Sequence, residues 1–376
     1  MRKLLINALS VTNQSGLHVL MGHGNRLLVE LSDTLRLVVL CREEMASLRT
    51  AWGDRVDWVF APPSTAGWLA RSVWEYWQLR SVVTQAGADA YFTPSGVAAP
   101  SLPVPQLVFC QNPWALVPEA RRRRDAPKAW LQRLAYRRTM HVAEVVIFNS
   151  CFMQEAYRKN AGRQANQECV VYQAPKDSTH ERALAWRERE RKPGQIVCVS
   201  AMGPHKNVET VVQAVAKLRD KGVKDVSLQL VGGWPDPAYE RRIRRLVAQL
   251  HLEGLVHFRG FVSREELDRY LAESRVFCLM SRCESFGIPA IEAQCFGTPV
   301  VSSAVCAVPE ICGEGGLYFL PDAVDGVAGG LALLLEDEHE WQRMSQAARL
   351  NADRFVWKKC SLPLVELVRK AEKLKG

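Results

Sequence analysis

The sequence has no hydrophobic run that approaches the roughly 18 apolar residues of a membrane-spanning helix, so no such helix is predicted for this chain of 376 residues. A secretory leader is not predicted either. Residues 1–10 combine a charged start with an apolar stretch, but the stretch is short and runs into the turn-forming residues 11–16. This pattern is typical of a first strand followed by a glycine turn rather than of a signal peptide.

Paired cysteines are missing as well. The eleven cysteines are scattered and odd in number, and no two of them have the C-x-x-C spacing. This argues against both a zinc site and a disulfide framework, and it favours a protein of the reducing cytoplasm. No D-x-D pair follows a predicted strand, so we expect neither a metal ion nor another cofactor.

What is present is the pattern of two α/β domains. The length allows two cores, and the composition, with 48% hydrophobic and 24% charged residues, is that of a globular protein. Short apolar runs alternate with longer helical patterns, which is typical of a doubly wound α/β sheet. In the first half, strands are predicted over residues 4–8, 35–40, 56–60, 90–92, 106–109, 144–148 and 170–175.

Domain boundaries follow from the composition of the segment after residue 176. It is rich in charge and poor in apolar residues up to residue 194, which indicates a linker. We therefore predict a first domain over residues 1–176, a linker over 177–194 and a second domain over 195–355. Residues 356–376 are predicted to form a terminal helix.

The most informative stretch of the second domain follows an apolar run at residues 276–280. That run predicts a buried strand, and Gly287 and Pro289 predict that a helix opens directly after the connecting loop. Such a turn directs backbone N–H groups and the positive end of the helix dipole at one point, where a phosphate can bind. Glu284 and Glu292, eight residues apart, flank that point, and carboxylates accept hydrogen bonds from sugar hydroxyls. The alternative is that Glu284 caps the helix and Glu292 is solvated.

A second strand-to-helix turn carries Lys206. It follows the apolar run at residues 195–200 and precedes an amphipathic helix that starts near Val208. Lys206 at this helix start is placed to meet a diphosphate. Taken alone, Lys206 would be better explained as a solvated lysine at a helix end.

The spacing of Glu284 and Glu292, with Phe286 and Gly287 between them, resembles the E-x7-E motif of retaining glycosyltransferases of family 4. The resemblance covers residues 195–360 and implies the GT-B fold, in which two Rossmann-like domains face each other across a cleft. It implies that Glu284 holds the sugar hydroxyls, that Glu292 holds the ribose and that Lys206 and Arg282 offset the charge of the leaving pyrophosphate. It further places Phe286, Gly287, Ile288 and Gly232 in the donor site, with Phe261 and Val262 at the nucleotide base.

This chain departs from the family pattern at one donor position. Ala201 stands where the family commonly has an arginine, so Arg282 is the candidate for a substitute charge. The resemblance also implies that the terminal helix crosses back onto the first domain, which would bind the acceptor.

In the first domain the candidate site residues follow predicted strands. Asn13 and Gly16 lie between the first strand and a helical pattern from Leu17, where amides could face a phosphate. Gln111 and Asn112 follow the strand at 106–109, at the edge where open α/β sheets bind ligands. Family members often have a histidine or an acidic residue there, facing the sugar, whereas Gln111 and Asn112 can only exchange hydrogen bonds. Both segments are equally compatible with ordinary turns that contact no ligand.

A strongly basic stretch runs from Arg121 to Arg138, where eight residues are basic and are interleaved with Trp130, Leu131, Leu134 and Tyr136. Residues 1–180 hold 21 Lys and Arg against 14 Asp and Glu, an excess of +7, which indicates an anionic partner. A helix of this composition can lie on an anionic membrane, and a lipid-linked glycan at the inner membrane face is one hypothesis for the acceptor. The alternative is a solvated helix that packs on its own domain through the same apolar residues.

These features predict a retaining glycosyltransferase that moves a sugar from a nucleotide-sugar donor to a glycan or lipid-linked glycan, in cell-surface polysaccharide synthesis. Two rival interpretations are less consistent with these features. A sugar-nucleotide epimerase would need acid/base groups on both sides of the sugar, which Gln111 and Asn112 do not supply. A non-catalytic protein that binds nucleic acid through the basic stretch would leave the donor-type motifs unexplained.

Overall fold

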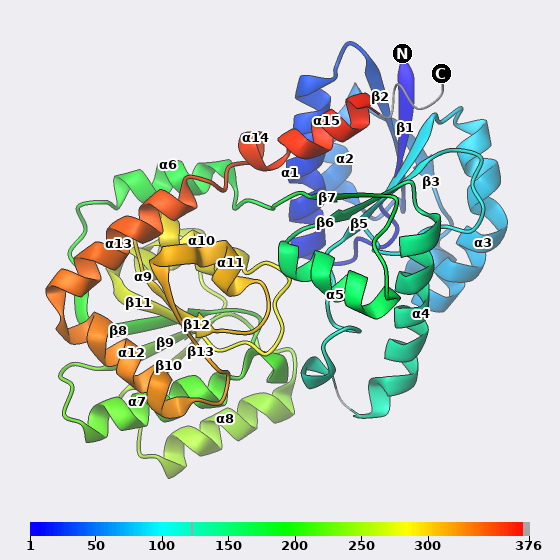
Figure 1. The fold of residues 1–376 in the computed structure, drawn as a ribbon. Coiled ribbons are helices and arrows are strands. Elements are labelled where there is room, and N and C mark those ends of the chain that lie inside the picture. The colour runs from blue at the N-terminus through cyan, green and yellow to red at the C-terminus, as the bar shows by residue number, and fades with distance from the viewer. Residues whose placement is uncertain (122, 371–376) are drawn as a thin grey trace. The chain divides into compact units, whose positions relative to one another are not determined.

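The computed structural model describes residues 1–121 and 123–370 and divides the chain into two compact units. Of the described residues, the first unit contains 1–116, 123–174 and 357–370, and the second contains 117–121 and 175–356. Each unit is a parallel sheet covered by helices, as Figure 1 shows. The two sheets confirm the predicted α/β class. Among the described residues no helix combines the length and the apolar character that crossing a bilayer requires.

The sheet of the first unit has the strand order β3-β2-β1-β4-β5-β6-β7, with every neighbouring pair parallel. The order reverses between β1 and β4, so the connection through α3 returns the chain across the sheet. The strands are β1 (Arg2–Asn7), β2 (Leu35–Cys41), β3 (Asp57–Phe60), β4 (Ala90–Thr93), β5 (Gln106–Cys110), β6 (Val145–Phe148) and β7 (Gln167–Val170). The helices are α1 (Gln14–Glu30), α2 (Ala46–Trp52), α3 (Trp68–Gln85), α4 (Ala126–Val142), α5 (Cys151–Ala161), α14 (Trp357–Cys360) and α15 (Leu362–Lys370).

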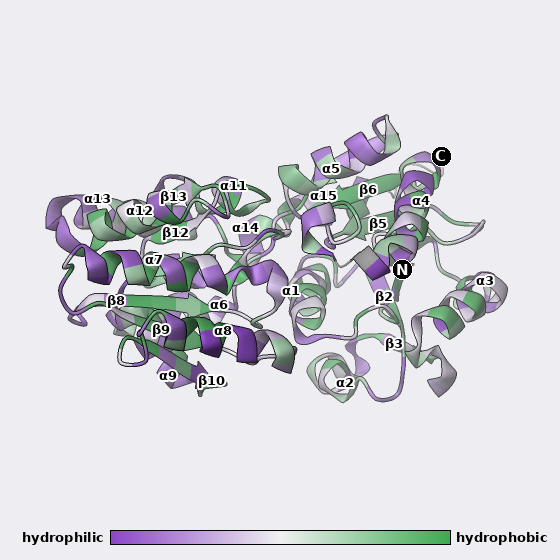
Figure 2. Cartoon of the chain, turned by 90° about the horizontal axis from the view of Figure 1, so that it is seen from below, coloured by the Kyte–Doolittle hydropathy of each residue, from purple (hydrophilic) through white to green (hydrophobic). Residues whose placement is uncertain are grey.

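The sheet of the second unit has the order β10-β9-β8-β11-β12-β13 and is also parallel throughout. Strands β6 and β8 are green in Figure 2, the apolar colour expected of strands buried on both faces. The strands are β8 (Lys192–Val199), β9 (Ser227–Val231), β10 (Val256–Gly260), β11 (Ser274–Leu279), β12 (Val300–Ser303) and β13 (Gly316–Phe319). The helices are α6 (Asp177–Ala185), α7 (Val208–Asp220), α8 (Pro237–Gln249), α9 (Arg264–Glu273), α10 (Ile288–Cys295), α11 (Val308–Cys312), α12 (Val324–Glu336) and α13 (Glu338–Ala352).

The segment predicted as a linker is folded. Residues 177–185 form α6, which buries Thr179 and Ala183, and β8 already begins at Lys192. The segment belongs to the second unit, which begins at Pro175. Its charged composition misled the prediction because its arginines are paired: Arg182 lies 2.5 Å from Asp268, and Arg189 lies 3.2 Å from Glu273.

The C-terminal helices α14 and α15 pack in the first unit, against α1. In Figure 1 the red α15 lies beside the blue α1. Leu364, Val365 and Val368 join the apolar core that α1 forms with one face of the sheet. Burying these side chains stabilises the unit by about 1.5–3 kcal/mol each.

Two glycines let α1 approach large aromatic residues closely. A Cβ atom on Gly22 would lie 2.2 Å from the Trp357 ring, and one on Gly24 would lie 2.3 Å from the ring of Trp52. Trp52 is fully buried, and its indole N–H donates to Asn25 Oδ1 at 2.7 Å. The ring therefore has no room to withdraw.

We expect Gly24→Ala to lower the free energy of unfolding by about 1–3 kcal/mol, because overpacking outweighs the gain in helix propensity. Gly329→Ala in α12 is the matched control: no atom lies within 4 Å of its added Cβ, so stability should stay constant or rise by up to about 1 kcal/mol. Calorimetric melting measures both variants. Equal melting temperatures for Gly24→Ala and the wild type would contradict the packing argument.

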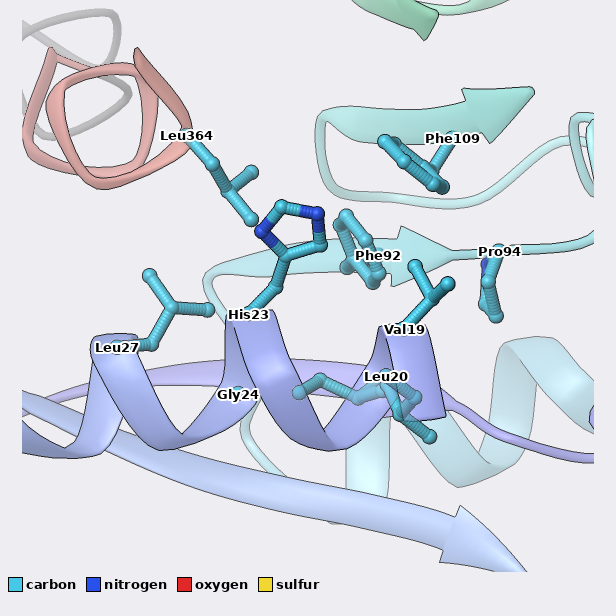
Figure 3. Close-up of a pocket in the computed structure, with 10 residues that line it drawn as sticks. Val19, Leu20, His23, Gly24, Leu27, Phe92, Pro94, Phe109 and Leu364 are labelled. Carbon is cyan, nitrogen blue, oxygen red and sulfur yellow. The ribbon is translucent and has the colours of Figure 1, made fainter. Parts of the chain in front are cut away.

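His23 on α1 is buried in an apolar pocket between Phe92, Phe109 and Leu364 (Figure 3). Its Nδ1 lies 2.9 Å from Ser361 Oγ, and its Nε2 has no hydrogen-bond partner among the described residues. Burial, reinforced by the nearby His18, lowers the pKa of His23 from 6.5 to about 3. The imidazole is therefore neutral at pH 7 and acts as part of the core.

This depressed pKa makes the first unit acid-sensitive. The pKa of His23 is lower in the folded state than in the unfolded state. The contribution of neutral, buried His23 to the free energy of unfolding is therefore fully present above pH 6.5 and is lost as the pH falls toward 3. The slope is at most about 1.4 kcal/mol per pH unit. We expect His23→Gln to flatten the fall in melting temperature between about pH 7 and pH 5, whereas His339→Gln, at an exposed site, should not. An unchanged pH profile in His23→Gln would show that His23 does not cause the sensitivity.

Candidate functional site

The second unit brings Lys206 and Glu284 together, although they lie 78 residues apart. Strands β8 and β11 are neighbours in the sheet, and the loops after them carry these two side chains. Lys206 Nζ lies 2.5 Å from Glu284 Oε1, and each side chain is 15% exposed. Ser281 Oγ donates a hydrogen bond to the same carboxylate oxygen at 3.1 Å. Lys206 and Ser281 thus hold one oxygen of the Glu284 carboxylate, and both members of the ion pair keep a small exposed fraction.

The neighbouring His205 also belongs to this turn. Its carbonyl accepts a hydrogen bond from the Arg282 backbone N–H at 2.8 Å, which ties the turn after β8 to the loop after β11. Burial, together with the Lys206 ammonium, lowers the pKa of His205. His205 is therefore neutral at pH 7, and Lys206 carries the positive charge of the turn.

Arg282 has a partner that the sequence did not predict. Its guanidinium donates to both carboxylate oxygens of Asp322, at 2.8 and 2.5 Å, and to Asn207 Oδ1 at 3.3 Å. Hydrogen bonding in this pair raises the pKa of Arg282 and lowers the pKa of Asp322. In this arrangement Arg282 joins the loops after β8, β11 and β13, and Lys206 is the cation beside Glu284.

The N-terminus of α10 opens next to Glu284. Gly287 is the N-cap residue with φ 101°, a conformation that favours glycine, and it has no side chain with which to cap the helix. The carboxylate of Glu284 pairs with Lys206 and Ser281 instead of with this helix end, as far as the described residues show. Phe286 is buried and packs edge-on against Phe355, with ring centroids 5.6 Å apart, so its ring anchors the loop. Ile288, half-buried, is the first residue of the helix.

Glu292 is not solvated. Its carboxylate accepts a hydrogen bond from Arg264 at 2.8 Å and is 13% exposed. Arg264 lies 3.0 Å from the buried Asp268, which pairs in turn with Arg182 at 2.5 Å. This chain of ion pairs holds the Glu292 carboxylate against α9 and α6.

Gly232, Phe261 and Val262 lie around the ends of β9 and β10. Gly232 has φ 126°, and a Cβ there would lie 1.9 Å from the Ser200 carbonyl oxygen, so close backbone approach explains this glycine. The ring of Phe261 lies against Gly233 and is 90% exposed. Val262 is half-buried and precedes Ser263, which begins α9 with a capping box.

In the first unit, Asn13 and Gly16 cap a helix. Asn13 Oδ1 accepts a hydrogen bond from the Gly16 N–H at 2.7 Å, and α1 begins at Gln14 rather than at the predicted Leu17. The Gly16 amide is therefore already paired, which departs from the predicted role of this turn as an open phosphate site.

Gln111 and Asn112 also have partners within their own unit. The Gln111 amide donates to the Pro94 carbonyl at 3.3 Å and accepts from the Gln173 amide at 3.4 Å. Asn112 Oδ1 accepts from the Trp114 N–H at 3.1 Å, which makes a turn. Gln111 is half-buried and Asn112 is exposed.

Three arginines of the basic stretch are paired within their own unit. Arg133 and Arg137 donate to the side chain and carbonyl of Asn160, and Arg138 donates to the carbonyls of Ala98 and Ala99. These three arginines hold α4 to its own unit. Arg122 lies outside the described residues. Tyr136 is fully buried and stacks on Tyr157 of α5, which is the packing that the alternative interpretation expects, whereas Trp130, Leu131 and Leu134 are 61%, 54% and 38% exposed.

Sequence reasoning missed three residues that shape the site: Asp322, Arg264 and Asn207. Asp322 and Arg264 act across loops that only the fold brings together, and nothing in the sequence marks them. Asn207 has φ 52° and donates to the Pro321 carbonyl at 2.8 Å. Its place between Lys206 and the helix start was a usable signal, because asparagine favours such left-handed turn positions.

Comparison with known proteins shows which proteins the chain resembles. The family model described as "Glycosyl transferases group 1" matches residues 182–351. O-antigen chain mannosyltransferase B of Escherichia coli is 32% identical over 181 residues, which cover 47% of this chain and 45% of that protein. The chain thus spans less than half the length of this curated relative.

Similar solved structures cover the chain almost completely. Sucrose-phosphate synthase of Thermosynechococcus elongatus has a TM-score of 0.75 and 19% identity, covering 98% of this chain and 99% of its own. Anabaena HepE, solved in complex with UDP, has a TM-score of 0.73 and 19% identity, covering 98% and 100%. These likenesses confirm the predicted GT-B fold. Residues 182–351 are thus similar to the group 1 glycosyltransferases, and the two Rossmann-like units have the GT-B fold.

Proposed function

We propose that this protein is a retaining hexosyltransferase that moves a sugar from a nucleotide-sugar donor to a glycan or lipid-linked glycan acceptor in cell-surface polysaccharide synthesis. The observation that carries the proposal is the Lys206–Glu284 pair beside the N-terminus of α10. A cation and a helix N-terminus attract a diphosphate, while a carboxylate in the same place accepts hydrogen bonds from sugar hydroxyls. A nucleotide sugar contains both groups.

The leaving diphosphate meets Lys206 and the backbone amides at the start of α10. The ammonium has three N–H donors, so it can donate to Glu284 and to the diphosphate at the same time. Both charge sources are fixed before the reaction, so little reorganisation is needed as negative charge develops on the leaving oxygen. Arg282, held by Asp322, keeps the two loops at this spacing.

Glu284 and Glu292 hold the two hydroxyl-bearing parts of the donor. Glu284 receives Lys206 and Ser281 on Oε1, which leaves Oε2 to accept from the transferred sugar. Glu292 receives Arg264 on Oε1, which leaves its other oxygen for the ribose. Phe261 and Val262, at the turn after β10, meet the base, and Gly232 and Gly287 let the backbone come close to the nucleotide.

The reaction breaks the bond between the anomeric carbon and the diphosphate oxygen and forms a bond from that carbon to an acceptor hydroxyl. In the retaining course the hydroxyl approaches the oxocarbenium-like centre on the face that the diphosphate leaves. The hydroxyl proton passes to a leaving phosphate oxygen. Lys206 supplies the positive charge, so we expect the reaction to need no metal ion.

The acceptor is assigned to the first unit, which carries the excess of basic residues. Gln111, Asn112 and Asn13 offer amide groups at the carboxyl edge of the sheet, where hydroxyls of the sugar or acceptor can exchange hydrogen bonds with them. The E. coli relative is an O-antigen chain mannosyltransferase, which supports a polysaccharide acceptor. A peripheral position at the cytoplasmic membrane face, with the stretch from Arg121 to Arg138 near anionic lipid, follows from a lipid-linked acceptor.

Titration with a panel of UDP-, GDP-, ADP- and dTDP-sugars tests the donor assignment. We expect one nucleotide sugar to raise the melting temperature. At 100 times its Kd it should add about 2.7 kcal/mol to the free energy of unfolding. Glu292→Ala should abolish the rise. Glu240→Ala on α8, whose carboxylate pairs with Arg244, is the matched control and should respond like the wild type. A rise that survives in Glu292→Ala would contradict the ribose role, and no rise with any sugar nucleotide would contradict the donor site.

A further inference from the structure

Helix α3 of the first unit exposes an apolar stripe. Leu69, Val73, Tyr76 and Trp77 recur at helical spacing and are 61%, 59%, 61% and 71% exposed, and Trp68 at the start of the helix is 48% exposed. The rings of Tyr76 and Trp77 contact each other edge-on, with centroids 5.1 Å apart. Toward the C-terminal end of the helix, Leu79 and Val83 are buried in the core. Contiguous exposed apolar side chains of this kind mark an interaction surface.

The charges of α3 favour an anionic partner. Its one carboxylate, Glu75, is turned inward, where it accepts a hydrogen bond from the Asn7 amide at 2.8 Å. Arg80 is exposed and lies one turn from Tyr76 and Trp77. The outward face of the helix therefore combines aromatic and aliphatic groups with positive charge.

Helix α4 carries a second apolar group on the same side of the sheet. Leu79 and Val83 of α3 pack with Tyr91 of β4, while Tyr136 and Met140 of α4 pack with Val108 of β5. Tyr91 pairs with Gln106, two residues before Val108, so Tyr91 and Val108 point to the same face. The exposed Trp130, Leu131 and Leu134 of α4 thus belong to the layer that also presents the α3 stripe.

We infer that the outward faces of α3 and α4 together form a membrane-contact surface that rests in the headgroup layer of a phospholipid bilayer. We define this surface by Leu69, Val73, Tyr76 and Trp77 of α3 and by Trp130, Leu131 and Leu134 of α4. In the basic-stretch hypothesis, electrostatic attraction to anionic lipid provides the binding energy, whereas here the burial of apolar side chains provides most of it. Three of the basic residues are tied to carbonyl and amide oxygens of their own unit, so apolar insertion supplies most of the affinity.

A bilayer fits this surface better than a protein partner for a chemical reason. Tryptophan and tyrosine favour the interface between headgroups and acyl chains, because their rings are apolar and their N–H and O–H groups remain hydrated. Flanking arginines add attraction to anionic lipid. The inference extends the membrane position in the proposed function and rests on that proposal only for the identity of the acceptor.

Flotation of the full chain with phosphatidylcholine vesicles, with and without phosphatidylglycerol, tests the inference. We expect the wild type to float with both, more strongly with anionic vesicles, and to remain largely bound at about 1 M NaCl, where the Debye length is about 3 Å. Leu69→Ser and Trp77→Ser should each lower the partition coefficient about tenfold. Leu350→Ser is the matched control, because Leu350 in the second unit is 65% exposed and Leu69 is 61% exposed.

Three results would overturn the inference: no flotation of the wild type, equal loss in Leu350→Ser, or complete release by salt. A concentration-dependent dimer that Leu69→Ser abolishes, without vesicle binding, would assign the surface to a second copy of the chain instead. Titration of Leu69→Ser with nucleotide sugars separates this inference from the proposed function. The donor-dependent rise in melting temperature should be unchanged in this variant, whichever way the flotation result falls.

Discussion

The ion pair between Lys206 and Glu284 is the interaction on which the site of this protein depends. Its two members come from loops after adjacent parallel strands, and the sheet fixes the distance between those loops. A lysine and a glutamate that are each 15% exposed are partly desolvated, so each needs the other's charge. Removing one partner would leave the other charge partly buried, which is why the two residues act as a unit.

The side-chain contacts around this pair reach the same oxygen of Glu284, Oε1. Ser281 and Lys206 occupy one oxygen of Glu284, and the backbone contact between Arg282 and His205 joins the two loops. Gly287 begins α10 in a left-handed conformation and leaves its N-terminus without a side-chain cap. Arg264 does for Glu292 what Lys206 does for Glu284, since it holds one carboxylate oxygen and leaves the other. Two carboxylates are thus fixed eight residues apart along one loop and helix.

The sequence allowed the fold class and the strand-to-helix turns to be predicted because those depend on local patterns. Buried strands such as β8 and β11 are apolar runs, and Gly287 and Pro289 mark a helix start. Strand β7 was placed three residues too late because Gln167 and Glu168 are polar, as an edge strand permits, and Glu168 is held by Arg158 at 2.7 Å. Helix α6 was missed because it buries only Thr179 and Ala183. The partners of Arg282 and Glu292 could not be predicted, since Asp322 and Arg264 reach them only through the folded loops.

The most direct test of the account is the affinity of two variants for a nucleoside diphosphate and for the corresponding nucleotide sugar, measured by calorimetry. The account predicts that Lys206→Met weakens both ligands by about tenfold or more, because it removes the charge that meets the diphosphate. Glu284→Gln should weaken only the nucleotide sugar, because the carboxylate contacts the transferred sugar. Unchanged diphosphate affinity in Lys206→Met, or equal weakening of both ligands in Glu284→Gln, would contradict the assignment of these two residues.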